Sequence, residues 1–460
     1  MILIKNRQFY KTVLTIGIPI ALQNLITFSV SLADTVMLSR ASHIDELVSA
    51  ADLANKTMFL LIITLFGLTG GGVVLASQYW GKGDMKSIRK ITAMILHMGF
   101  IISCAMGAAV LLFPSGVMAI FTKDAIIIEK GAEYLSIVGW SYFLLGISTI
   151  LMIMLRSVEV VKIALLADIA ALVLSISLNW VLIFGNLGFP ALGIRGAAIS
   201  TLIARTVSFL IAIIYVFFID KRLQFRIKDI WCFDAPLFRD ILKYGFPVLF
   251  HQVAWAMGIT VQAMIIGHID YAAGNFIAAN AATGVIFHLF MVAMFGMSNA
   301  AIIIVGKSIG EGKPVEAQDK AQTLFTLSFM MGILVCSVIL ITRNATITVF
   351  MLSPETDALA RELLVYVAFL AFFTSIASMS LAGIFRGGGD TRVCLIIEMT
   401  CMWGVAIPLA TLCAFVFKLP IPVVYIAMKI DEVIKVIICS VRIRGNTWIR
   451  NLTVDRREPA

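Results

Sequence analysis

Long runs of apolar residues recur along the whole chain, and short polar or charged segments separate them. Each run has about 20 residues or more, the length at which a helix crosses the roughly 30 Å hydrocarbon layer of a bilayer. The pattern predicts twelve membrane-spanning helices, at residues 14–38, 55–79, 93–118, 132–155, 164–187, 195–219, 243–267, 278–306, 322–342, 360–385, 393–416 and 421–441. Most connections are short, which favours antiparallel neighbouring helices.

The two halves of this pattern are related in sequence. Landmarks of the first half recur in the second half at an offset of 228 to 230 residues. They are Gly17 and Pro19 with Gly245 and Pro247, Phe66-Gly67 with Phe295-Gly296, Gly81-Lys-Gly83 with Gly310-Glu-Gly312, and Arg156 with Arg386. A shared offset indicates two equivalent halves, and in a membrane protein it suggests a substrate path between two bundles.

This repeat predicts the domain organisation. We expect an N-lobe of six helices at residues 1–219, an inter-lobe linker at 220–242, a C-lobe of six helices at 243–445 and a cytoplasmic tail at 446–460. The linker mixes Trp231, Phe233 and Leu237 with cationic residues, a composition typical of an amphipathic segment on the cytoplasmic face.

Composition excludes a soluble protein. Hydrophobic residues make up 60% of the chain, charged residues 14%, and the mean hydropathy is +0.98. Soluble domains have roughly 45–50% apolar and 25% charged residues. The predicted fold class is therefore an all-α integral membrane protein, with twelve transmembrane helices in two pseudo-symmetric six-helix lobes.

Lysine and arginine predict the orientation of these helices. The connections on the side of the amino terminus carry 25 of them and the opposite connections carry eight. By the positive-inside rule both termini are cytoplasmic, in a cell (plasma) membrane. The net charge of +9 follows from this bias and gives no reason to expect nucleic acid as a partner. The first apolar run follows a short basic segment without a cleavage site, so we expect a retained helix.

The seven cysteines are scattered and show no metal-ligand spacing. We therefore expect buried structural cysteines, with no metal and no cofactor.

Ionisable residues inside a span are candidate functional groups because they are costly to place in lipid. Asp34 lies about one turn inside the outer end of the first span, and no base three or four residues away can pair with it. Such a carboxylate can load and release a proton or hold a sodium ion; the alternative is an interfacial residue in water. Pro19 removes a backbone hydrogen bond from the same helix and permits a kink. Gln23 and Asn24 follow one turn later.

Several motifs taken together resemble the multidrug and toxic compound extrusion (MATE) transporters. They are LADTVML at 32–38 after Pro19, FGLTGGG at 66–72, QYWGKGD at 78–84, Leu155-Arg156, NWVLIFGNLGFPALGIRGAA at 179–198 and FRGGGDTR at 385–392. The resemblance covers nearly the whole chain, and the LADT context is closer to the DinF-like and archaeal branch than to the NorM-like branch.

The resemblance implies an antiporter that exports hydrophobic, often cationic organic compounds in exchange for protons, with Na⁺ possible as the coupling ion. Asp34 falls on the acid of the family's amino lobe. Related members commonly carry a second acid in the fifth span, where this chain has Asn179, and an asparagine where it has Ser175. These three residues are the candidate ion-coupling group.

The second half of the chain has no acid at the position equivalent to Asp34. Gln262 follows Pro247 by the fifteen residues that separate Asp34 from Pro19. NorM-like members place acids in span seven or eight and in span ten, whereas span seven here has no acid before Asp270 and span ten has none between Glu362 and Asp390. We therefore expect ion coupling to be confined to the amino lobe and titratable chemistry to be concentrated in residues 1–219.

Other polar residues within the spans are possible charge partners or cavity residues. Arg205 or Lys56, if paired with Asp34, would compete with a proton for the carboxylate. Asp168 lies near the cytoplasmic end of its span, where Lys162 or solvent can meet it. His251 and His288 are titratable candidates of the second half, although a lone histidine is more often a packing residue. Glu398 lies at a depth from which it can face a cavity.

Methionine and phenylalanine suit a cavity for varied apolar molecules because methionine adapts its shape easily. The same residues also face lipid and fill helix contacts, and for most of them this second role applies. The first candidates for the cavity are Trp255, Met257, Met264, Phe287, Met291 and Met294.

Three other functions remain as alternatives. A flippase for lipid-linked precursors or polysaccharides requires a strongly cationic cavity. A channel requires a continuous polar stripe, and a membrane enzyme requires a catalytic cluster; the spans show neither. We expect a monomer that is not an enzyme and whose partners are the lipid bilayer and small hydrophobic or cationic substrates.

Overall fold

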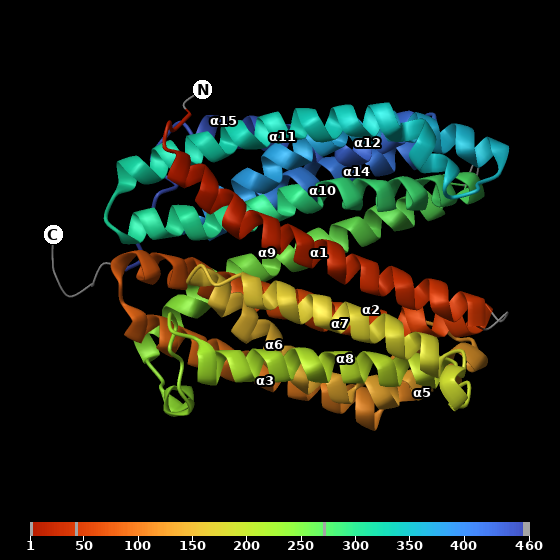
Figure 1. Ribbon diagram of the computed structural model, residues 1–460. Coiled ribbons are helices and arrows are strands. Elements are labelled where there is room, and N and C mark those ends of the chain that lie inside the picture. The colour runs from red at the N-terminus through yellow and green to blue at the C-terminus, as the bar shows by residue number, and fades with distance from the viewer. Residues whose placement is uncertain (1–2, 42–44, 270–272, 454–460) are drawn as a thin grey trace. The chain divides into compact units, whose positions relative to one another are not determined.

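The computed structural model describes residues 3–41, 45–269 and 273–453. Within these ranges the chain is helical and has no strand. The helices of the first half are α1 (Arg7–Ala41), α2 (Asp45–Lys82), α3 (Met85–Leu112), α4 (Pro114–Ala119), α5 (Ala125–Val138), α6 (Trp140–Ser157), α7 (Lys162–Leu182) and α8 (Ile194–Ile214), which a π-helical turn extends to Ile219 (Figure 1).

The second half follows with α9 (Ala235–Gly267), α10 (Ala273–Gly310), α11 (Pro314–Thr348), α12 (Pro354–Ser378), α13 (Thr391–Glu398), α14 (Ile407–Thr411) and α15 (Ile421–Arg442). Three π-helical segments continue these helices: η4 (Met379–Phe385), η5 (Met399–Ala406) and η6 (Leu412–Val416). The predicted tenth span is thus α12 with η4, and the eleventh runs from α13 to η6.

Eleven helical segments of the described ranges are long and apolar enough to cross a membrane. The twelfth helix is α15, which is 22 residues long but carries Lys429, Asp431, Glu432 and Lys435. The predicted fourth span is interrupted at Gly139, which separates α5 from α6. The protein is therefore an all-α integral membrane protein with twelve transmembrane helices.

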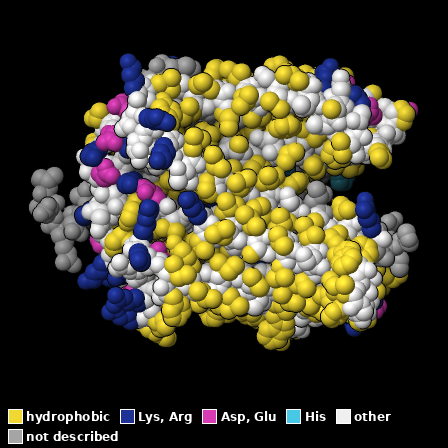
Figure 2. All heavy atoms as spheres, in the orientation of Figure 1, with side chains coloured by type: hydrophobic (Ala, Val, Ile, Leu, Met, Phe, Trp, Pro, Cys, Tyr) yellow, Lys and Arg dark blue, Asp and Glu magenta, His cyan; other side chains and the backbone are white. Residues whose placement is uncertain are grey.

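The chain divides into two compact units. The N-unit comprises Leu22–Ala76 and Asp84–Leu242, and the C-unit comprises Met1–Ala21, Ser77–Gly83 and Lys243–Ala460. Compared with the predicted contiguous lobes, the C-unit also includes the beginning of α1 and the end of α2. In each unit apolar side chains cover the length of the helices and charged side chains gather at the helix ends (Figure 2). This surface suits a hydrocarbon layer bounded by polar headgroups.

Within the C-unit, two repeated glycines explain how the ends of α2 and α10 approach each other. A Cβ atom at Gly81 would overlap the carbonyl group of Lys307, and a Cβ atom at Gly310 would overlap that of Gln78. Only glycine permits this contact between backbones.

The segment after α15 packs against the C-unit as far as Thr453. Trp448 is fully buried, and its indole N–H donates to Gln318 over 3.1 Å. The side chain of Gln78 donates to the carbonyl oxygen of Arg450 over 3.1 Å and accepts from the backbone N–H of Leu452 over 2.8 Å. Residues 446–453 of the predicted tail are therefore an ordered part of this unit.

Within the N-unit, the predicted linker is anchored to α3. Lys90 donates to Asp234 over 2.7 Å, and Arg89 donates to the carbonyl oxygen of Leu223 over 3.0 Å. This contact with the Lys90 ammonium holds the pKa of the Asp234 carboxyl below its ordinary value of 3.8. Trp231 is 82% exposed, as an interfacial aromatic residue would be.

Candidate functional site

The carboxylate of Asp34 is the centre of the candidate site in the N-unit. Its Oδ1 accepts a hydrogen bond from Asn179 Nδ2 over 2.5 Å and one from Ser175 Oγ over 3.3 Å. Ser175 and Asn179 are four residues apart on α7 and therefore lie on one face of that helix. The structure thus brings together the three residues that the sequence analysis assigned to ion coupling.

Neighbouring helices hold this face of α7 in place. Ser200 on α8 donates to the carbonyl oxygen of Ser175 over 3.0 Å. Asn179 is fully buried, and its Oδ1 has no hydrogen-bond partner among the described residues. A buried amide oxygen beside a carboxylate is an additional acceptor for a proton donor or a cation.

A small pocket lies beside Asp34. It is lined by residues of α1, α2, α5 and α8: Asp34, Leu38, Val48, Ala51, Asp52, Asn55, Tyr134 and Ala197. Tyr134 donates to Asn55 over 3.2 Å, so two pocket residues position each other. The sequence analysis missed Asp52, Asn55 and Tyr134, because a long sequence separation hides their proximity to Asp34.

The two basic residues considered as partners of Asp34 lie elsewhere. Lys56 pairs with Asp52 one turn away on α2, over 3.4 Å. Arg205 forms no ion pair with Asp34, although both are described, and interacts with it only electrostatically. Neither base therefore forms an ion pair with the Asp34 carboxylate.

Asp168 and Gln23 belong to a second polar group of the N-unit. Asp168 lies within electrostatic range of Arg156 and Arg205. The sequence analysis had offered Lys162 or solvent as its partner. The buried side chain of Gln23 accepts from Arg156 and donates to the carbonyl oxygen of Val161 over 3.2 Å. Gln23 is therefore held within the helix bundle, and Asn24 beside it is half-buried.

In the C-unit, Gln262 lies where the repeat places the counterpart of Asp34. It is buried, accepts from Lys429 over 2.7 Å and donates to the carbonyl oxygen of Met428 over 2.9 Å. The Gln262 amide beside the Lys429 ammonium thus takes the place that the Asp34 carboxylate and the Asn179 amide have in the N-unit.

The second half nevertheless contains buried titratable groups. Glu398 is 2% exposed and forms an ion pair with Lys435 over 3.0 Å. His251 is 7% exposed and lies 3.6 Å from Glu398. The expectation that titratable chemistry is concentrated in residues 1–219 is therefore wrong, and Glu398 lies in a packed cluster. Four charges within the predicted last span, from Lys429 to Lys435, were the signal for this cluster.

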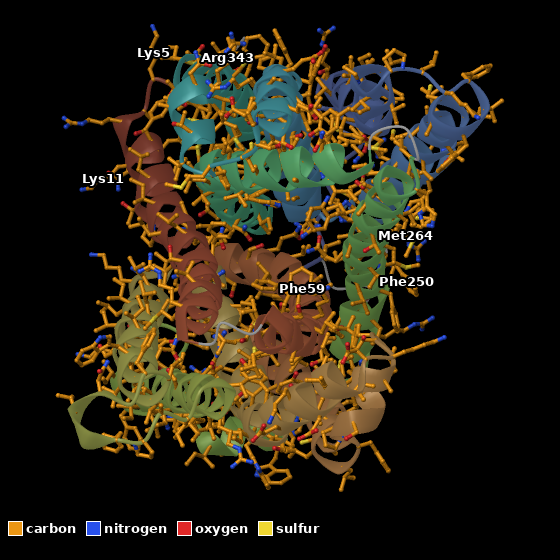
Figure 3. The ribbon with its side chains drawn as sticks, turned by 90° about the vertical axis from the view of Figure 1, so that its right-hand side faces the viewer. Lys5, Lys11, Phe59, Phe250, Met264 and Arg343 are labelled. Atoms are coloured by element: carbon orange, nitrogen blue, oxygen red, sulfur yellow. The ribbon has the colours of Figure 1, made fainter. Side chains whose placement is uncertain are left out.

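The predicted cavity residues fall into two groups. Met291 and Met294 are fully buried, so helix packing rather than a cavity surface accounts for them. Met257 and Met264 are 54% and 57% exposed on α9, along which Figure 3 labels Met264 and Phe250. Trp255 and Phe287 are half-buried, and Phe287 packs edge-on against His288. Exposed methionines on α9 thus remain candidates for contact with apolar molecules.

Comparison with known proteins agrees with this architecture. A sequence model of the MatE family matches residues 19–181 and 247–412, which are the two repeated halves. The chain is similar to the uncharacterized transporter YisQ of Bacillus subtilis, with 26% identity over 91% of this chain and 90% of that protein. It is also similar to the probable multidrug resistance protein NorM of Thermotoga maritima, with 22% identity over 98% of this chain and 95% of that protein.

A solved structure shares the fold. The crystal structure of MATE in complex with MaD3S superposes with a TM-score of 0.85 at 18% identity, covering 96% of this chain and 99% of that one. The expected arrangement of twelve transmembrane helices in two lobes is therefore confirmed.

Proposed function

Because the chain belongs to the MatE family of membrane transporters, we propose that it is a secondary active multidrug antiporter. It exports hydrophobic or cationic organic compounds in exchange for protons, or for Na⁺, by alternating access. The observation that carries this proposal is the Asp34 carboxylate inside the helix bundle, bound by Asn179 and Ser175 and without a basic ion-pair partner among the described residues.

The chemistry of this site supports ion exchange. A carboxylate held by two neutral donors keeps its negative charge free to bind a proton or a monovalent cation. A base in direct contact would neutralise that charge, but Lys56 forms its ion pair with Asp52 instead. Binding at Asp34 therefore changes the net charge of the pocket by one unit.

The proposed cycle couples this charge to the shape of α1. Substrate binds the inward-open state, outward opening releases it, and a proton that enters from outside neutralises Asp34 and resets the protein. Pro19 leaves one hydrogen bond of α1 unmade, and α1 passes from the C-unit to the N-unit between Ala21 and Leu22. Each ligand drives the cycle only through its different affinities for the two states.

Substrate class and placement are part of the proposal. The Thermotoga maritima relative is named a probable multidrug resistance protein, and this name supports polyspecific export. The LADT segment around Asp34 supports a place in the DinF-like and archaeal branch. We place the protein in the plasma membrane as a monomer, with both termini cytoplasmic as the positive-inside rule predicts.

A flippase for lipid-linked anionic precursors is the second transport function considered. It would need a strongly cationic cavity, whereas the pocket beside Asp34 is lined by two carboxylates and no base. The pocket therefore favours a cation over a phosphate as its ligand.

Efflux from proteoliposomes tests the proposal. Purified protein is reconstituted with an entrapped fluorescent organic cation, and either a pH gradient or a sodium gradient is imposed alone. We expect the inward-directed proton gradient to accelerate efflux relative to liposomes without protein. Acceleration by sodium alone would identify Na⁺ as the coupling ion, and no acceleration by either gradient would contradict the antiport function.

A further inference from the structure

The linker begins with a non-helical segment whose side chains alternate between buried and exposed. Leu223 and Phe225 are fully buried and anchor the segment in the N-unit. Arg222, Gln224 and Arg226, which alternate with them, are exposed. Because apolar side chains are held inside while the polar ones are not, the linker has a fixed outer face rather than the form of a free loop.

Three acidic side chains of the linker are used to hold it in place. Asp220 and Asp229 each accept a hydrogen bond of 2.8 Å from a backbone N–H group of the linker itself. Asp234 pairs with Lys90 on α3 over 2.7 Å. These carboxylates therefore stabilise the local fold and do not form ion pairs with the cations of the outer face.

The basic side chains of the linker are exposed on its outer face. Lys221, Arg226 and Lys228 are exposed, and they form no ion pair within the part of the chain that the structure describes. Arg222 differs, because it lies 3.6 Å from Glu159. Lysine and arginine side chains gather at this end of the N-unit (Figure 2). The outer face thus carries three positive charges without a partner.

Apolar side chains are exposed beside these cations. Ile227 and Trp231 begin and end a 3₁₀-helical turn and are 68% and 82% exposed, and Phe233 beyond it is 67% exposed. Single exposed apolar side chains are common on any protein, whereas several together mark an interaction surface. Aromatic rings next to cationic side chains are typical of segments that lie in the interface of a membrane.

Contacts with α3 give the depth of this outer face. Lys90 binds Asp234 near the charged beginning of α3, whereas the ring of Trp231 lies 6.4 Å from that of His97, seven residues further along. Seven residues of an α-helix span about 10 Å. Beyond Lys90 the helix carries no Lys, Arg, Asp or Glu, so Trp231 lies beside its apolar part. Interfacial segments are buried to a similar depth of roughly 5 to 10 Å.

Two chemical groups are needed to cover this surface: an anion for the cations and hydrocarbon for the apolar side chains. An anionic phospholipid supplies both in one molecule, and clustered cations beside a span attract such lipids. A zwitterionic lipid brings a cation of its own to the same charges. An acidic protein in the water phase supplies the anion but does not reach Trp231 beside the apolar part of α3.

We propose that the outer face of the linker is a binding site for anionic phospholipid. The headgroup phosphate pairs with Lys221, Arg226 and Lys228, and the upper part of the acyl chains covers Ile227 and Trp231. The bound lipid anchors the N-unit in the leaflet that the positive-inside rule predicts to be cytoplasmic. Lipid binding here does not rest on the proposed transport function, so a failure of efflux leaves it untouched.

Quenching of tryptophan fluorescence by brominated lipids tests the contact with lipid. Full-length protein is reconstituted in phosphatidylcholine vesicles whose acyl chains carry bromine close to the headgroup or no bromine. The intensity lost to bromine should be smaller in Trp231→Phe than in wild type. Trp448→Phe, the matched control at a fully buried indole, should leave that loss unchanged. The proposal is overturned if Trp231→Phe also leaves it unchanged, which is the result for a linker that faces water or an acidic protein.

The same signal measures the preference for an anionic headgroup. Brominated phosphatidylglycerol replaces brominated phosphatidylcholine at equal mole fraction, and the part of the quenching that depends on Trp231 gives the relative binding of the two lipids. Each lysine or arginine near an anionic surface contributes roughly fivefold in binding. We therefore expect wild type to prefer phosphatidylglycerol, and Arg226→Gln with Lys228→Gln to lower this preference about fivefold or more.

A matched pair of substitutions separates the proposed site from net charge. Lys123→Gln with Lys418→Gln also removes two exposed positive charges, from connections on the opposite side by the positive-inside rule, and should keep the preference. Equal binding of the two lipids by wild type would overturn the proposal. An equal loss of preference in both double variants would overturn it as well, because net charge rather than the outer face of the linker would then explain the result.

Discussion

Asn179 on α7 donates a hydrogen bond of 2.5 Å to the carboxylate of Asp34 on α1. The two residues are far apart in sequence, and the contact connects the first helix of the N-unit with its fifth transmembrane helix. Because Asn179 is fully buried, this bond is shielded from water and fixes the direction in which the carboxylate points.

Removal of this amide should impair coupling. Asn179→Ala deletes a hydrogen bond to a charged group, which typically contributes about 1.5 to 3 kcal/mol. We expect gradient-driven efflux to fall about tenfold or more, measured as an initial rate in proteoliposomes. Ser177→Ala is the matched control because Ser177 is exposed on the same helix and donates only to the carbonyl oxygen of Val173. Equal rates for the two variants would exclude a role for the amide.

The contact between α2 and α10 within the C-unit predicts a strict requirement for glycine. Gly310→Ala puts a methyl group into the carbonyl oxygen of Gln78, and such overpacking costs about 1 to 3 kcal/mol or more. The Tm of the purified protein should fall. Gly284→Ala lies in the same helix with no atom within 4 Å of the added carbon, so it should leave the Tm unchanged or raise it slightly. A Gly310→Ala protein as stable as wild type would refute this packing.

Trp448 predicts that the segment after α15 stabilises the protein. Trp448→Ala removes a fully buried indole that lies against Phe385 and donates to Gln318, so we expect a loss of about 3 to 5 kcal/mol. The measurement is thermal unfolding in detergent. Trp231→Ala serves as control because that side chain is 82% exposed, and it should change the Tm little. Similar small effects of both substitutions would mean that the segment is a dispensable tail.

The Lys90–Asp234 pair predicts a dependence of stability on pH. The folded protein holds the pKa of Asp234 below 3.8, so the pair stabilises the protein above that value. This stability is lost as the pH falls through the folded-state pKa. Lys90→Met should destabilise by about 0.2 to 1 kcal/mol at neutral pH, and the difference from wild type should shrink on acidification. Lys86→Met, at an exposed lysine of the same helix, should show neither effect; a difference for Lys90→Met that stays constant with pH would contradict the pairing.

The sequence predicted the fold well because apolar runs of membrane length are unambiguous. The helices are longer than the apolar runs, as at α2, which begins at Asp45 rather than near residue 55, since polar ends extend into the interface. Asp34, Asn179 and Ser175 were predictable as a group for two reasons. The segments around them resemble motifs of the MATE transporters, and α7 places two of them on one face.

Contacts between distant segments were not predictable. Asp52, Asn55 and Tyr134 meet Asp34 only through tertiary packing. Lys56 pairs with Asp52, the acidic residue one turn away on the same helix, rather than with the distant Asp34. The cluster around Lys435 was missed because four charges in one apolar run were counted as part of a span, although buried charges need partners from other helices.

The most direct test of the central claim compares Asp34→Asn with Asp52→Asn in gradient-driven efflux. Both substitutions remove a carboxylate from the same pocket, but only Asp34 is bound by Asn179, whereas Asp52 pairs with Lys56 at an exposed position. Asp34→Asn should abolish the acceleration of efflux by an imposed ion gradient, and Asp52→Asn should keep it. Efflux by the Asp34→Asn protein at the wild-type, gradient-dependent rate would contradict the assignment of ion coupling to Asp34.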